Sequence, residues 1–255
     1  MISWATPNLT DPQINGERSG AILLRVAGFS KRFGADVALS EVDFAVREGE
    51  ILGLIGPNGS GKTTLLECLA GLLSTDHGSV TWRGEALPIR SRKTVLFYLP
   101  DGIAPFTDHR VANVLSFFGA AYQLPKDEIN TTLAALGLAP VLGKRAGELS
   151  KGYRRRLLLA IGLLAPHPLL LFDEPFDGLD LHQTRDVMRH LRSVAARGRT
   201  LFLSIHQLTD AARVCDRFVL LSAGRVRGEG TLETLRATAG LASDAGLEEV
   251  FLALT

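Results

Sequence analysis

From Ile22 onward, short apolar runs alternate with longer segments whose apolar residues recur at helical spacing. The short runs predict strands and the longer segments predict helices. Three of the short runs, EILGLIG (50–56), PLLLFDEP (168–175) and TLFLSIH (200–206), are apolar almost throughout. Continuous apolar runs are typical of parallel strands that are buried on both faces. The pattern therefore predicts an α/β fold built around a parallel sheet.

The other strand candidates have a different pattern. They alternate in polarity or end at glycine turns, such as those at Gly84 and Gly224, which favours a smaller antiparallel sheet. These candidates are ILLRV, VDFAV, VTWRG and FVLLSAGRV. We expect all of them in this second sheet.

Helical periodicity occurs between the core strands and throughout one long segment. Residues from about 102 to 165 contain three helical patterns and no convincing strand, which predicts a helical insertion in the α/β core. Residues 1–20 are polar and turn-rich and lack the apolar centre of a signal peptide. They are expected to form a flexible tail before one domain at 21–255.

Composition narrows the classes of partner. The 255 residues carry a net charge of +1, and no nucleic-acid partner is expected without a basic excess. Cys68 and Cys215 lie far apart, without metal-ligand spacing, which favours two buried, reduced thiols. The longest apolar stretch is interrupted at Pro166, His167 and Pro168, so no membrane span is predicted.

GPNGSGKTT, residues 56–64, matches the phosphate-loop pattern G-x-x-x-x-G-K-[ST] between a predicted strand and a predicted helix. Its glycines allow backbone N–H groups to surround an anion at the start of the helix. Lys62 is expected to reach the β- and γ-phosphates, and the Thr63 hydroxyl to ligate magnesium. The predicted ATP contacts here are Gly56, Asn58, Gly59, Ser60, Gly61, Lys62, Thr63 and Thr64. The alternative is a glycine-rich turn that matches by accident.

Acidic residues follow the second buried strand. Asp173 is expected to hold the magnesium shell, and Glu174 to polarise the attacking water as general base. Adjacent residues of a strand point to opposite faces, so the chain has to turn at this point to bring both acids to one site. His206 ends the next buried strand at the same sheet edge, where ligands bind in open α/β sheets, and is predicted to contact the γ-phosphate. A surface acid pair and a structural histidine are the alternatives.

LSKGYRRRL, residues 149–157, contains a second helix start that suits an anion. Ser150 is a good N-cap, and Gly152 allows close approach to the backbone. Taken alone, the stretch is better explained as an ordinary capped helix with a solvated arginine face.

Together these motifs resemble the nucleotide-binding subunit of an ATP-binding cassette (ABC) transporter, over residues 22–255. GPNGSGKTT resembles the Walker A loop, LSKGY the signature, LLLFDEP the Walker B strand, FDGLD the D-loop with Asp180, and SIH the switch-histidine loop. Phe33 in SKRFG matches the aromatic residue that stacks on adenine. The resemblance implies a P-loop NTPase core with a helical subdomain and a small antiparallel β subdomain. It also implies an ATPase that uses ATP and Mg²⁺.

In this family two cassettes meet head to tail, as a homodimer or with a second ATP-binding subunit. The resemblance implies that Ser150, Lys151 and Gly152 cover the ATP held by the partner. Lys151 stands where the family usually has glycine, and either approaches the partner's phosphate or faces solvent. Asp101, in VLFYLPDG, stands where the family usually has glutamine. It can offer an oxygen to magnesium but cannot donate an amide hydrogen bond.

The resemblance further implies a separate membrane permease and a location at the cytoplasmic face of the membrane. The segments LPDGIAPF, LSKGYRRRL and the closing LEEVFLALT resemble those of exporters, which favours export, with import as the open alternative. Phe106, Phe117, Phe118 and Tyr122 are candidates for the permease dock, although at least half of them are expected to fill the insertion's own core. Two alternatives are a soluble non-transport ABC ATPase that acts on nucleic acid or ribosomes, and a small-molecule kinase.

Overall fold

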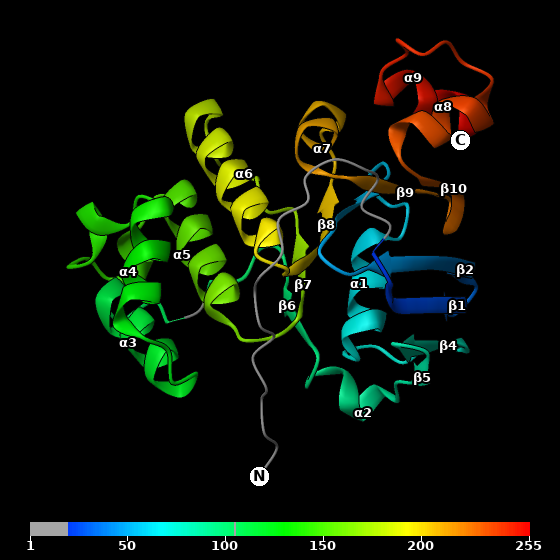
Figure 1. Cartoon of the computed structure of the whole chain (residues 1–255). Helices are drawn as coiled ribbons and strands as arrows, with labels where there is room; N and C mark the ends of the chain where they lie inside the picture. Colours follow the sequence, from blue (N-terminus) through cyan, green and yellow to red (C-terminus); the bar gives the residue numbers. More distant parts are fainter. Residues whose placement is uncertain (1–19, 105) are drawn as a thin grey trace.

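Two β-sheets and the helices around them make up a computed structural model that describes residues 20–104 and 106–255 (Figure 1). The strands are β1 (Ile22–Phe33), β2 (Asp36–Arg47), β3 (Ile51–Ile55), β4 (His77–Trp82), β5 (Glu85–Ala86), β6 (Leu96–Leu99), β7 (Leu169–Asp173), β8 (Thr200–Ile205), β9 (Arg217–Ser222) and β10 (Arg225–Gly230). The helices are α1 (Lys62–Ala70), α2 (Ile89–Arg92), α3 (Val111–Ala121), α4 (Lys126–Ala135), α5 (Lys151–Leu164), α6 (Leu181–Ala196), α7 (Leu208–Val214), α8 (Leu232–Ala239) and α9 (Leu247–Leu254), with 3-10 turns at Ala139–Val141 and Ala146–Glu148. The tail predicted at 1–20 lies, apart from residue 20, outside the described residues.

The larger sheet has the strand order β10-β9-β3-β8-β7-β6. Its strands from β9 to β6 run parallel, and β10 is antiparallel to β9. The three apolar runs predicted as parallel strands form its centre, and every residue of β3, β7 and β8 is buried. This confirms the prediction of a parallel sheet, because only strands covered on both faces can carry such runs.

One strand assignment from the sequence is wrong. FVLLSAGRV was expected in the small antiparallel sheet, but β9 pairs in parallel with β3 in the larger one. Four successive residues of β9, 218–221, are buried, which is the pattern of a central strand, and Gly224 then reverses the chain into β10. The sequence pattern also missed the short helices α2 and α7, whose few residues give too little periodicity.

The smaller sheet, in the order β2-β1-β4-β5, is antiparallel as predicted. Its first strand continues past the predicted ILLRV to Phe33. Gly28 has a φ of +64°, and the pairing register shifts at this point. A glycine that would otherwise indicate a turn acts here as a bulge, because it accepts a backbone conformation that other residues avoid.

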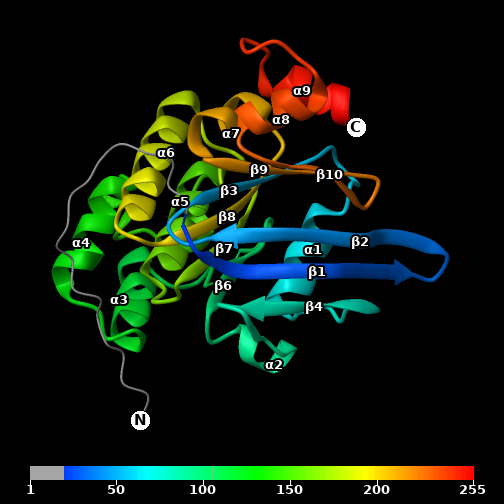
Figure 2. The same ribbon diagram turned by 45° about the vertical axis from the view of Figure 1, so that its right-hand side comes forward.

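The sheets enclose two apolar cores. Successive residues of β3 face opposite cores: Ile51 and Ile55 belong to the core that also contains residues of α5, α6 and α7, whereas Leu52 and Leu54 belong to the core formed with α1 and the smaller sheet. Cys68 and Cys215, one in each core, are buried free thiols as predicted, and burial raises the pKa of Cys68 to about 11. Figure 2 shows α1 beside β1 and β2, while α3, α4 and α5 gather on the other side of the large sheet. This group of helices is the predicted helical insertion.

Candidate active site

The loop between β3 and α1 lies at the carboxyl end of the parallel strands. Gly59 and Gly61 have φ angles of +80° and +104°, so consecutive N–H groups turn inward as in an anion nest. A Cβ atom on Gly56 would lie 2.3 Å from the carbonyl oxygen of Leu221, which leaves room for no other residue. Helix α1 begins without a side-chain cap, so its first N–H groups are available to an anion.

Lys62, the first residue of α1, is only 7% exposed. Its ammonium group donates hydrogen bonds to the carbonyl oxygens of Gly56 at 2.8 Å and Pro57 at 3.2 Å. It also lies 3.9 Å from a carboxylate oxygen of Glu174. A buried cation held by neutral carbonyls can exchange them for phosphate oxygens, which attract it more strongly.

Asp173 ends β7 and is 1% exposed. One of its carboxylate oxygens accepts a hydrogen bond from the Thr63 hydroxyl at 2.9 Å, and the other accepts from the hydroxyl of Ser204. A hydroxyl and a carboxylate that face each other at the mouth of a phosphate loop are the hard oxygen ligands that Mg²⁺ prefers. The residues present therefore fit the metal.

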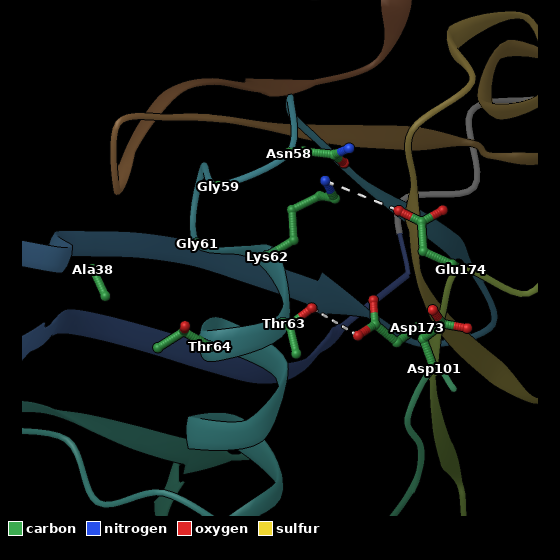
Figure 3. A pocket seen from close by; sticks show the side chains of 10 residues that line it. All are labelled: Ala38, Asn58, Gly59, Gly61, Lys62, Thr63, Thr64, Asp101, Asp173 and Glu174. Carbon is green, nitrogen blue, oxygen red and sulfur yellow. Dashed lines mark hydrogen bonds and ion pairs between the residues drawn. The ribbon is translucent and has the colours of Figure 1, made fainter. Parts of the chain in front are cut away.

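Glu174 has a φ of +49°, which is uncommon for a residue with a side chain. This turn places Glu174 on the same side as Asp173 (Figure 3), as the sequence argument required. Its backbone N–H donates to the Ser204 carbonyl at 3.2 Å and hydroxyl at 3.1 Å. Its carboxylate lies 2.6 Å from Nδ1 of His206. Backbone strain at a carboxylate held by a histidine is typical of a functional position.

These groups line one pocket of about 350 Å³. Most of the ATP and magnesium contacts predicted from the sequence come together in it (Figure 3). Its lining residues are Ala38, Asn58, Gly59, Gly61, Lys62, Thr63, Thr64, Asp101, Asp173 and Glu174. Gly56 is connected to the pocket through Lys62, which donates to its carbonyl oxygen, and Ser60 is buried.

Other predicted residues lie away from the pocket lining. Phe33 is 49% exposed at the end of β1, with the Lys31 ammonium 5.5 Å from its ring centre. Among the described residues, His206 is connected to the site through its contacts with Glu174. Asp180 caps α6, accepting from the Gln183 N–H at 2.9 Å. Their roles toward a nucleotide stay predictions.

The signature residues also lie outside the lining. The Ser150 hydroxyl caps α5 by accepting from the Tyr153 N–H at 3.4 Å, so the predicted N-cap is confirmed. Lys151 is exposed, as one of its two predicted positions requires, and its ammonium lies 2.8 Å from the Asp177 carboxylate of its own chain. This contact lowers the pKa of Asp177. A Cβ on Gly152 would lie 3.1 Å from the Gly178 carbonyl, so the glycine packs against the D-loop.

Sequence reasoning missed three residues of the site. Ser204 bonds both acids, and its place inside the SIH motif was the available signal. Ala38 lines the pocket from β2, a position that no pattern indicates. Arg155, buried in α5, pairs with Asp101, whereas the sequence suggested only that the arginines divide between solvent and packing.

Comparison with known proteins agrees with this geometry. The ABC transporter family model matches residues 39–177, more than half of the chain. The chain belongs to the ABC transporter family. As a cassette of this family it is an ATP-binding subunit and an ATPase. It is 36% identical over 223 residues to the Nod factor export ATP-binding protein I of Rhizobium sp. strain N33, covering 84% of this chain and 72% of that one. It is 33% identical over 216 residues to an uncharacterized ABC transporter ATP-binding protein of Methanocaldococcus jannaschii, covering 83% and 79%.

Solved structures support the same fold. An ATP-binding subunit of an ABC transporter superposes with a TM-score of 0.81 at 31% identity, covering 91% of this chain and 99% of that one. A nucleotide-free ABC transporter cassette gives a TM-score of 0.75 at 24% identity, covering 90% and 98%, and is similar in fold alone. The predicted fold class is therefore confirmed. Among the described residues of this ABC subunit, no helix is long and apolar enough to cross a membrane.

Proposed function

We propose that this ABC subunit binds Mg²⁺–ATP in the pocket between the 56–61 loop and the β7 acids. Thr63 and Asp173 hold the metal there. A bound Mg²⁺ would neutralise charge on the phosphates, and Asp101 would be a further candidate oxygen ligand. The observation that carries this proposal is the 2.9 Å contact between the Thr63 hydroxyl and the Asp173 carboxylate.

Glu174 acts as the general base. Its carboxylate is close enough to His206 to accept a hydrogen bond, at 2.6 Å, and this contact orients it. His206 also contacts the γ-phosphate, so the histidine links this phosphate to the Glu174 carboxylate. A positioned base of this kind contributes a factor of about 10² to 10⁴ to a rate, so Glu174→Gln should lower ATP hydrolysis by this factor while ATP still binds.

Two copies pair head to tail around two ATP molecules. The N-terminus of α5 is exposed at Ser150 and contributes nothing to the lining of its own chain's pocket. A helix start with free N–H groups is suited to a phosphate. Because α5 does not reach the phosphate site of its own chain, the phosphate it would contact is that of the ATP bound to the partner. A two-fold pair uses the same two half-sites on each copy, as closed symmetry requires. The family resemblance supports the same pairing.

Light scattering on Glu174→Gln with saturating Mg²⁺–ATP tests the pair, and the expected mass is that of a dimer. The matched variant is Ser150→Asp in the same background. Aspartate caps a helix as well as serine does, so α5 is retained, but the added charge repels the partner's γ-phosphate. This double variant should remain a monomer. A Glu174→Gln protein that stays monomeric, or a double variant that dimerises equally well, contradicts the proposal.

The dimer drives a separate membrane permease at the cytoplasmic face of the membrane, in the direction of export. Its relatives include proteins named for Nod factor export, which favours this direction. The dock is the surface between the Asp101 loop and α3. There Phe117 is 61% and Phe106 39% exposed. Phe118 is half-buried against both of them, and Tyr122 is half-buried against Phe118. Half of the aromatic candidates thus remain available to a partner.

Recovery of the tagged protein with detergent-solubilised membranes of its own cells tests the dock. Phe117→Ala should lower this recovery without changing ATP hydrolysis by the isolated protein. Ser116→Ala, at an exposed neighbour on α3, is the control and should change neither. Recovery with ribosomes or nucleic acid instead of membrane protein would favour the non-transport alternative.

A further inference from the structure

The residue that departs from the family pattern in the pocket is held by an arginine. Asp101 follows β6 and lines the nucleotide pocket. Its carboxylate is paired with the guanidinium of Arg155, which lies on α5 five positions after its N-cap, Ser150. A second nitrogen of the same guanidinium lies 3.5 Å from the backbone carbonyl of Asp173. One side chain therefore connects the loop after β6, the end of β7 and the signature helix.

Arg155 is suited to this position by burial. Its side chain is 5% exposed, whereas that of Asp101 is 45% exposed. A buried cation needs an anionic partner, since its desolvation is otherwise uncompensated. Asp101 is the acid that pairs with it among the described residues. The pair therefore determines where the loop after β6 can lie.

Charge gives the pair a second consequence. Asp101, Asp173 and Glu174 all line the pocket, and Lys62 is the cation that lines it. Three carboxylates beside one ammonium repel a triphosphate, and the repulsion is strong at short range in a partly buried site. Arg155 approaches Asp101 from behind the lining and neutralises it. An uncharged glutamine at this position, as the family usually has, creates no such requirement.

We propose that Arg155 is a positioning residue of the nucleotide site, which neutralises Asp101 and fastens the loop after β6 to helix α5. The loop and the signature segment then move as one unit. The inference rests on the proposed function only in taking ATP as the ligand. It concerns a contact within one chain that exists without nucleotide, so it can be tested separately.

The test compares the wild type with Arg155→Gln, Asp101→Ala and the double variant. Amide hydrogen exchange of residues 100–104, measured without nucleotide, shows how firmly the Asp101–Arg155 pair, the tether, holds the loop after β6. The affinity for ATP, measured by calorimetry in EDTA, shows whether the charge of Asp101 is neutralised. Loss of the tether in either single variant should speed exchange of the loop by about tenfold or more, because a local opening no longer breaks the ion pair.

The two readouts should separate in the double variant. Arg155→Gln exposes ATP to a third uncompensated carboxylate and should weaken binding in EDTA about tenfold. Adding Asp101→Ala removes this charge, so affinity should return to within about threefold of the wild type. Loop exchange should stay fast in the same protein, because the tether is still absent. Unchanged ATP affinity in Arg155→Gln, or a double variant no better than this single one, overturns the proposal.

Arg154→Gln is the matched control on the same helix. Its side chain donates to the carbonyl of Leu149 at 3.4 Å rather than to an acid, so both readouts should stay within about twofold. If Arg155→Gln does not fold, Asp101→Ala decides alone, and an unchanged rate of loop exchange then rejects the tether. A wild type that fails to bind ATP in Mg²⁺ rejects the proposed function and leaves the exchange result valid.

Discussion

The helices α1 and α5 both begin at a site that suits an anion, yet they begin differently. Helix α1 starts at Gly61, has no side-chain cap and carries a buried lysine at its first position. Helix α5 starts at Ser150, whose hydroxyl already accepts from a first-turn N–H. Its first-position lysine is exposed and paired with Asp177.

This difference separates a complete site from half of one. The start of α1 has its cation, the Thr63 hydroxyl and three acids within one pocket. At the start of α5, the Lys151 ammonium is already paired with Asp177, and the helix presents its first N–H groups on an exposed surface. A ligand can be held firmly at the first helix start and only covered by the second. Substitutions at matched positions of the two helices test this comparison.

The largest effect is expected from the matched lysines. Lys62→Gln removes the buried cation and should lower ATP hydrolysis by at least about 100-fold, the usual cost of losing one charge-stabilising donor. Lys151→Gln makes the same change at the other helix start and should leave ATP binding by the single chain unchanged. Calorimetry measures ATP binding and phosphate release measures ATP hydrolysis, each in both variants. Equal losses would show that the helix starts are equivalent.

The two glycines should differ in their effect on the free energy of unfolding. Gly61 has a φ of +104°, and a Cβ there would lie 2.6 Å from the Ala38 carbonyl, so Gly61→Ala should cost about 1–3 kcal/mol. In Gly152→Ala the nearest atom is the end of the Gln183 side chain at 2.8 Å, which can move, and the nearest backbone atom, the Gly178 carbonyl oxygen, is farther away at 3.1 Å. Its cost should be smaller. Urea unfolding of both variants measures the difference, and a larger cost at Gly152 would contradict it.

The N-cap of α5 should affect stability without affecting the first site. Ser150→Ala should lower the free energy of unfolding by about 1 kcal/mol, as loss of a capping hydroxyl does. Ser150→Asp should restore it, and neither should alter ATP binding by the isolated chain. A thermal melt with and without ATP reads both properties. A Ser150→Ala protein with weakened ATP binding would mean that α5 acts on its own chain's pocket.

The smallest effect is the pH dependence of the Lys151–Asp177 pair. The hydrogen bond from Lys151 lowers the pKa of Asp177, so its contribution is present above the unfolded pKa of about 3.9. It is lost as the pH falls through the lower folded value. Because Lys151 is 69% exposed, the contribution should be about 1 kcal/mol or less. The stability difference between the wild type and Lys151→Gln should disappear in strong acid. A difference that persists would instead come from the methylene groups of Lys151, which lie against Gly178.

The sequence predicted the central sheet because β3, β7 and β8 are apolar almost throughout. It failed for β9, where the glycine turn suggested a hairpin in the other sheet. Sheet membership depends on which strand lies beside β3 after the chain crosses over, and this is a long-range contact that no local pattern contains. The sequence also failed to predict that β1 continues past Gly28, because a glycine in the sequence does not distinguish a turn from a bulge.

The site residues likewise divide into those that local sequence predicted and those that depend on long-range packing. Lys62, Thr63, Asp173 and Glu174 were predicted because each stands at a fixed offset from a buried strand, so local geometry brings them to one edge. Ser204 and Arg155 approach from other elements, and their contacts depend on how those elements pack.

The sequence by itself determined the parallel core, the phosphate loop, the acid pair and the capped start of α5. Each of these follows from spacing along a short segment, where backbone geometry leaves few choices. Only the tertiary structure decided that Lys151 is neutralised by Asp177 and that Asp101 is held by Arg155. Pairing between charges depends on distance through space and on burial. The sequence indicates neither for Asp101 and Arg155, which are 54 positions apart along the chain.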